Sequence, residues 1–109
     1  MIEAVVGSEG AERVLLFLAA RDGGYAREIA NCWAMDVSTV QNQLQRMERD
    51  GLLVSRTVGR TRVFSFNPRY AFKEEVRALL NKALAQLPAD VREQLTLYRK
   101  RPRRTGKPL

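Results

Sequence analysis

The 109-residue chain has an ordinary globular composition, with 45% hydrophobic and 28% charged residues, so one compact domain is expected. Its net charge of +7 and sequence pI of about 10.3 favour an acidic partner, either nucleic acid or an anionic membrane surface. The sequence contains no histidine and a single cysteine, Cys32. These counts argue against a disulfide framework, a zinc or copper site, and any catalytic triad that depends on histidine. No metal or other cofactor is therefore expected.

The positive charge is concentrated at one end of the chain. Residues 89–109 hold seven Lys or Arg against two acidic residues, and therefore carry five of the seven net positive charges. We expect a folded domain over residues 1–88 and a basic C-terminal extension over residues 89–109. The longest apolar run, Val14 to Ala20, is too short to cross a bilayer, and the first ten residues lack the features of a secretory signal. A cytoplasmic protein is therefore expected.

Three helices are expected in the first half of the chain. Ser8 can cap a helix that runs to about Arg21, where the two glycines of the sequence RDGGY permit a turn. A short second helix is expected from about residue 27 to residue 33. Asp36 suits the N-cap of a third helix, which Gly51 then ends.

A β-hairpin and a long helix are expected in the second half. Residues alternate with a period of two over 53–57 and 62–66, on either side of a turn at Gly59-Arg60. An amphipathic helix follows from about Tyr70 to Leu87, and residues 90–98 can form a further short helix. The expected fold class is mainly α with a small β-hairpin (α+β), in the order helix, helix, helix, hairpin, helix.

The third expected helix has an unusual polar surface. Its apolar stripe is narrow and runs from Val37 through Val40 and Leu44 to Met47. The other side carries amides and hydroxyls, whereas solvent-exposed helices usually favour Glu and Lys. Asn and Gln side chains can bind adenine bidentately in the major groove of DNA. The amide and hydroxyl residues are Ser38, Thr39, Gln41, Asn42, Gln43 and Gln45.

The stretch REIANCWAMDVSTVQNQLQRMERDGLL, residues 27–53, resembles a winged helix-turn-helix domain of the bacterial ArsR/MarR-like transcriptional regulator type. Such domains place an Ala, a small residue four positions later, a Val ten positions after the Ala, a Leu four beyond that, and a Gly-Leu pair. The hairpin and the NPRY sequence after it also resemble the family's wing and its exit, so the resemblance covers about residues 11–87. The residues at the five pattern positions are Ala30, Ala34 (in place of the customary Gly), Val40, Leu44 and Gly51-Leu52.

The resemblance implies sequence-specific binding of double-stranded DNA, with the third helix in the major groove and the wing on the backbone or in the minor groove. It also implies a transcriptional regulator that acts as a repressor by blocking access. The expected contacts of the recognition helix are Ser38, Thr39, Gln41, Asn42, Gln45 and Arg46. The expected contacts of the wing are Arg56, Arg60 and Arg62, which cluster on or beside the hairpin tip. Metal-sensing relatives carry cysteine pairs or acidic and histidine sets that this sequence lacks.

The basic tail has two open interpretations. It either grips DNA phosphates without sequence preference or docks on another protein. Its cations are Arg99, Lys100, Arg101, Arg103, Arg104 and Lys107.

A homodimer is also expected. The first helix has apolar residues on two sides, and the long helix carries a leucine-rich stripe from Phe72 to Leu87. Because one small domain cannot easily cover both surfaces, we expect two copies to meet through residues 11–20 and 72–87. A small-molecule effector would then bind between helices or at the seam between the two copies.

Two other classes of function stay open. The first is a winged-helix protein–protein interaction module, an adaptor or antitoxin-like partner that uses the basic tail for docking; the amide-rich helix argues against it. The second is an enzyme, which has the least support. Glu74 and Glu75 lie on an exposed helix without the arrangement of a catalytic pair, and the sequence has no glycine-rich loop that could bind phosphates. Cys32, Trp33 and Tyr25 are interpreted as core or core-edge residues.

Overall fold

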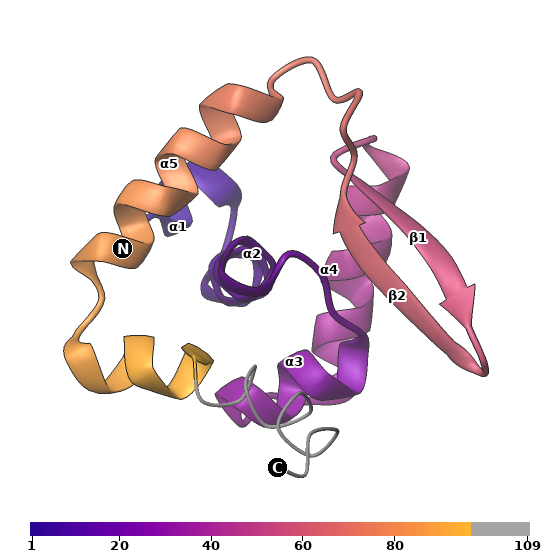
Figure 1. Cartoon of the computed structure of the whole chain (residues 1–109), viewed down its shortest axis with the longest axis horizontal. Helices are drawn as coiled ribbons and strands as arrows, with labels where there is room; N and C mark the ends of the chain where they lie inside the picture. The colour runs from indigo at the N-terminus through magenta and orange to yellow at the C-terminus, as the bar shows by residue number, and fades with distance from the viewer. Residues whose placement is uncertain (97–109) are drawn as a thin grey trace, which may run out of the picture.

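The computed structural model describes residues 1–96, which fold into helices and one two-stranded antiparallel sheet (Figure 1). The element order confirms the expected α+β class, with one additional short helix at the start. Residues 89–96 are also helical. The elements are α1 (Glu3–Val6), α2 (Glu9–Arg21), α3 (Ala26–Trp33), α4 (Val37–Arg49), β1 (Leu53–Val58), β2 (Thr61–Phe66) and α5 (Lys73–Gln86).

The predicted N-terminal ends of two helices are confirmed. Ser8 caps α2, because its hydroxyl oxygen accepts a hydrogen bond from the backbone N–H of Ala11 at 3.1 Å. Asp36 occupies the N-cap position of α4, but its carboxylate does not bind the helix backbone. It accepts a hydrogen bond from the Ser38 hydroxyl at 3.1 Å instead.

Helix α2 forms the centre of the domain. Figure 1 shows it end-on, with α5, α4 and α3 placed around it. Val14, Phe17 and Leu18 are 0% exposed, and residues on both apolar sides of α2 are buried within the single chain. The expectation that residues 11–20 need a second copy to cover them is therefore wrong. The physical reason is that α5 crosses one side of α2 while α3 and α4 cover the other.

Helix α5 begins three residues later than expected. The Asn67 side chain accepts a hydrogen bond from the Arg69 backbone, and Tyr70 and Lys73 donate to carbonyls three residues before them. These turns occupy the segment that the periodicity assigned to the helix. As a consequence Phe72 does not enter the core but is 60% exposed, with its ring against that of Tyr70.

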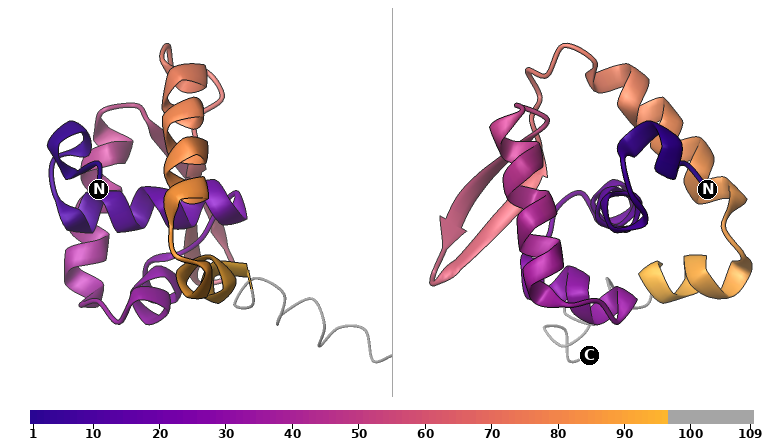
Figure 2. Two further views of the ribbon diagram at one scale, coloured as in Figure 1. Left: turned by 90° about the vertical axis from the view of Figure 1, so that its left-hand side faces the viewer. Right: turned by 180° about the vertical axis from the view of Figure 1, so that it is seen from behind.

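The packed domain continues beyond residue 88, where the sequence places its boundary. The helical residues 89–96 return toward the ends of α2 and α3, as both views in Figure 2 show. Leu95 is buried, and its carbonyl accepts a hydrogen bond from the Arg21 guanidinium at 3.1 Å. The Gln94 amide donates to the Cys32 carbonyl. Residues 89–96 therefore pack on the folded domain through Leu95, with Val91 half-buried beside the core.

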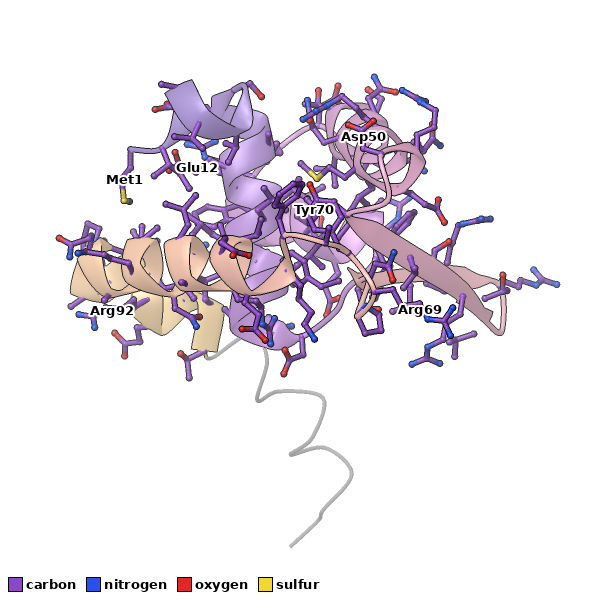
Figure 3. All side chains as sticks on the ribbon, turned by 90° about the horizontal axis from the view of Figure 1, so that it is seen from above. Met1, Glu12, Asp50, Arg69, Tyr70 and Arg92 are labelled. Atoms are coloured by element: carbon purple, nitrogen blue, oxygen red, sulfur yellow. The ribbon has the colours of Figure 1, made fainter. Side chains whose placement is uncertain are left out.

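A buried carboxylate lies beside the start of the chain. Figure 3 shows Met1 and Glu12 close to each other beside α1. Glu12 is buried and accepts a hydrogen bond from the Ile2 backbone N–H at 2.7 Å, while the Met1 ammonium lies 3.2 Å from its carboxylate. These groups provide the pairing that a buried charge requires.

Among the described residues, no helix has the length and hydropathy needed to cross a membrane.

The turn between α3 and α4 contains a conformationally unfavourable alanine. Ala34 ends α3 in the left-handed region with φ of 56°, and the side chain is exposed. Glycine adopts this conformation at no steric cost. We expect Ala34→Gly to raise the free energy of unfolding by about 1 kcal/mol, measured by thermal or urea denaturation. Ala78→Gly is the matched control, because Ala78 is exposed inside α5. This substitution should lower the free energy of unfolding by about 1 kcal/mol. Destabilisation by both substitutions would contradict the prediction.

Candidate nucleic-acid interface

Helices α3 and α4 form a pair that buries one side of α4 and leaves the other side open. Ile29 and Ala30 of α3 and Val40 and Leu44 of α4 belong to the same buried core. Leu44 is 0% exposed, and Met47 continues the buried stripe one turn later. This stripe is the one the sequence predicts from the helical period.

The amide and hydroxyl residues of α4 face away from the domain. Asn42 lies opposite the buried stripe, on the middle of the open side. Among residues 1–96, no hydrogen bond occupies the Asn42, Gln41 or Gln45 side chains. Paired donors and acceptors are thus presented to the exterior, while the Ser38 hydroxyl is partly engaged by Asp36. The exposed residues of this set are Ser38, Thr39, Gln41, Asn42 and Gln45.

Arg46 differs from the other predicted recognition residues. Its side chain is half-buried, and its guanidinium donates two hydrogen bonds to the side-chain oxygen Oε1 of Gln43, at 2.8 and 3.2 Å. It lies on the flank of α4 that faces the start of α2, close to Gly7. Gln43 therefore holds Arg46 beside the amide surface, a role that the sequence analysis did not assign to it.

Strands β1 and β2 form the wing, here defined as the hairpin of residues 53–66. Gly59 has φ of 66°, as a tight two-residue hairpin turn requires. The register pairs Thr57 with Arg62 and Arg56 with Val63. Because side chains alternate between faces, Arg62 lies on the face toward α4 and Arg56 on the opposite face. Arg60 lies in the turn, and Arg56 and Arg62 lie beside it, but the pairing separates Arg56 from Arg62, so the three wing arginines do not share one face.

An open groove of about 410 Å³ separates the wing from α4. Gln41 and Gln45 line one side of it, and Arg60 and Arg62 line the other. Arg27, in the first turn of α3, also lines the groove. The sequence analysis did not select this residue. Its position in the sequence could have indicated this role, because a cation at the start of the helix before the recognition helix can reach the same DNA backbone. The full lining is Tyr25, Ala26, Arg27, Val37, Gln41, Gln45, Arg60, Thr61, Arg62 and Phe64.

Cys32 and Trp33 lie at or near the core, as expected. Cys32 is buried, and that burial raises the pKa of its thiol above the usual range. A thiol with a raised pKa has less of the reactive thiolate form at neutral pH. Trp33 is half-buried beneath the Arg13 guanidinium, which lies 5.7 Å from the ring centroid. Among residues 1–96, no three His, Cys, Asp or Glu side chains gather as a metal site would need.

The basic tail lies outside the residues that the structure describes. The predicted tail contacts concerned are Arg99, Lys100, Arg101, Arg103, Arg104 and Lys107.

A helix pair with an open polar face, followed by a hairpin beside that face, defines the winged helix-turn-helix fold. No protein-family profile matches the sequence, and no curated protein matches it. Solved structures do match. A probable transcriptional regulator from Pseudomonas aeruginosa superposes with a TM-score of 0.55 at 20% identity, covering 87% of this chain and 80% of that one. MepR, a transcription regulator of the Staphylococcus aureus multidrug efflux pump MepA, has a TM-score of 0.58 at 18% identity, covering 97% and 84%.

A point mutant of MepR bound to an oligodeoxyribonucleotide also matches, with a TM-score of 0.54 at 17% identity and the same coverage of 97% and 84%. At these identities the comparisons establish the fold. The chain has the winged-helix fold of transcription regulators.

Proposed function

We propose that this protein is a sequence-specific, double-stranded-DNA-binding transcriptional regulator that acts as a homodimeric repressor. The observation that carries the proposal is the exposed amide surface of α4 beside a groove lined by arginines. Amides that bind neither the domain core nor each other have donors and acceptors available for base edges. The fold likeness to a regulator bound to an oligodeoxyribonucleotide adds support.

In this proposal α4 enters the major groove. Asn42 and Gln45 contact base edges, with Gln41 on the side of the wing. Ser38 and Thr39, at the start of the helix, contact the nearer phosphates or bases. Arg46, which Gln43 holds at the flank, contacts the phosphate backbone.

The wing contributes charge in the same arrangement. Arg60 at its tip and Arg62 on its inner face neutralise phosphates or enter a narrow minor groove. Arg56 lies on the outer face and reaches a phosphate only on the far side of the wing. Arg27 extends the cationic lining of the groove to α3.

The homodimer in this proposal uses the turn before α5 together with α1, because α2 and the leucine-rich stripe of α5 are already covered within the single chain. Phe72 is 60% exposed and Val5 is 70% exposed, whereas large apolar side chains are usually buried. Sedimentation of the protein at several concentrations tests the association. A Phe72→Glu variant that stays monomeric would support the seam, and an unchanged dimer would exclude Phe72 from it.

Selection of bound sequences from a random duplex pool tests the function directly. A regulator enriches one motif, with two half-sites related by a two-fold axis if it binds as a dimer. Binding of every duplex with equal affinity and a steep salt dependence would refute sequence-specific regulation. Absence of binding to any duplex would favour the alternative of a protein–protein interaction module.

Removing the cation at the wing tip is expected to weaken binding without changing sequence preference. For each protomer bound, Arg60→Ala should reduce affinity about five- to tenfold on every duplex and lower the slope of log affinity against log salt by about 1. Fluorescence anisotropy at several salt concentrations measures both quantities. Arg92→Ala is the matched control, because Arg92 is exposed and lies far from the wing side of the molecule (Figure 3). A sequence-dependent loss in Arg60→Ala would contradict a phosphate contact.

A further inference from the structure

A chain of hydrogen bonds joins the recognition helix to both strands of the wing. The Ser55 hydroxyl in β1 donates to the Glu48 carboxylate in α4 at 2.6 Å. The same oxygen accepts a hydrogen bond from the Arg62 Nε in β2 at 3.0 Å. Ser55 thus contacts a charged group on each side, and hydrogen bonds to charged groups are stronger than those between neutral groups.

This chain lies at the point where the wing leaves the domain. The base of the wing is anchored by buried Leu53 and Phe64, whereas Thr57 and Val58 nearer the tip are exposed. Within residues 1–96, no hydrogen bond ties the wing to α4 any nearer the tip than Ser55. An isolated two-stranded hairpin is only marginally stable in water, so its orientation depends on such contacts.

The same chain restricts Arg62. Its Nε is used by Ser55, and among the described residues no hydrogen bond engages its two terminal nitrogens. The side chain is exposed and lines the groove with Gln41 and Gln45. A guanidinium fixed through Nε keeps its remaining donors available and loses less side-chain freedom when it binds an anion.

We propose that Ser55 is a positioning residue of the DNA interface, which couples α4 to the wing through Glu48 and preorganises Arg62 for a phosphate. The inference rests on the proposed function. It requires a hydroxyl at position 55, because one atom must both donate to a carboxylate and accept from a guanidinium. Threonine retains both capacities, whereas alanine retains neither.

A double-mutant cycle tests the proposal on the duplex selected from the random pool. Ser55→Ala is expected to weaken binding about three- to tenfold when Arg62 is present, and by less than about twofold in the Arg62→Ala background. Ser55→Thr should bind like the wild type. The matched control is Ser65→Ala, because Ser65 lies on the opposite face of the same hairpin and should not change affinity.

Two results on the selected duplex would overturn the proposal. One is wild-type affinity in Ser55→Ala, and the other is an equal loss with and without Arg62, which would indicate a general structural role. Amide hydrogen exchange in the free protein provides a readout independent of DNA. Wing amides should exchange faster in Ser55→Ala than in Ser65→Ala or the wild type, and equal exchange would also overturn the inference. If the wild type binds no duplex, the proposed function fails and the exchange measurement alone decides whether Ser55 orients the wing.

Discussion

Asn42→Ala is expected to reduce affinity for the selected duplex about 5- to 150-fold and to relax the choice of base at one position of each half-site. Asn42 lies at the middle of the open side of α4 and its side chain is exposed. A bidentate amide contact to a base contributes about 1–3 kcal/mol of discrimination against the wrong base, which corresponds to this range. Anisotropy titrations with the selected duplex and with single-base variants of it measure both effects.

Asn81→Ala is the matched control for this experiment. Asn81 is an exposed asparagine inside α5 and lies outside the groove between α4 and the wing. Both substitutions improve helix propensity slightly, so neither should destabilise the fold. Wild-type affinity and wild-type base preference in Asn42→Ala would exclude a base contact by this residue. A loss that is equal on all duplexes would assign Asn42 to the backbone instead.

Gly24→Ala is expected to destabilise the domain by about 3 kcal/mol, because the new methyl group has no space. A Cβ at this position would lie 2.6 Å from Cε1 of Phe17 and 3.1 Å from a Glu28 carboxylate oxygen. Phe17 is 0% exposed in the core, so its ring cannot move outward. Overpacking of this kind costs about 1–3 kcal/mol and occasionally more. The backbone cannot retreat either, since Gly24 exchanges two hydrogen bonds with Phe64, at 3.0 and 2.8 Å.

Thermal denaturation measures this effect, with an expected decrease in Tm of about 10–20 °C for a domain of this size. Gly10→Ala is the control, because its Cβ would make only ordinary contacts of 3.6–3.8 Å inside α2 and should leave stability equal or higher. Adding Phe17→Leu to Gly24→Ala tests the cause, since a smaller side chain should recover part of the loss. An unchanged Tm in Gly24→Ala would show that the core accommodates the methyl group.

The sequence predicted most helix and strand positions to within a few residues. Ser8 and Asp36 mark the starts of α2 and α4, and Gly59-Arg60 marks the turn of the wing. Helical period, capping and hairpin turns depend on residues a few positions apart, so a single sequence contains the necessary information. The start of α5 is the exception. The apolar period places it at about Tyr70, but hydrogen-bonded turns that begin at Asn67 occupy this segment and the helix begins at Lys73.

The sequence by itself therefore determined the fold class and the side of α4 that faces outward. The apolar residues of that helix recur with the helical period and so lie along a single side of it. The tertiary structure alone decided which of the other apolar surfaces are covered and how the wing lies against α4. It placed α5 and residues 89–96 against α2, and it set the angle between α4 and the wing that brings Glu48 within hydrogen-bonding distance of Ser55. The first set of contacts joins residues distant in the sequence, and the second depends on how two elements pack against each other, so no local pattern specifies either of them.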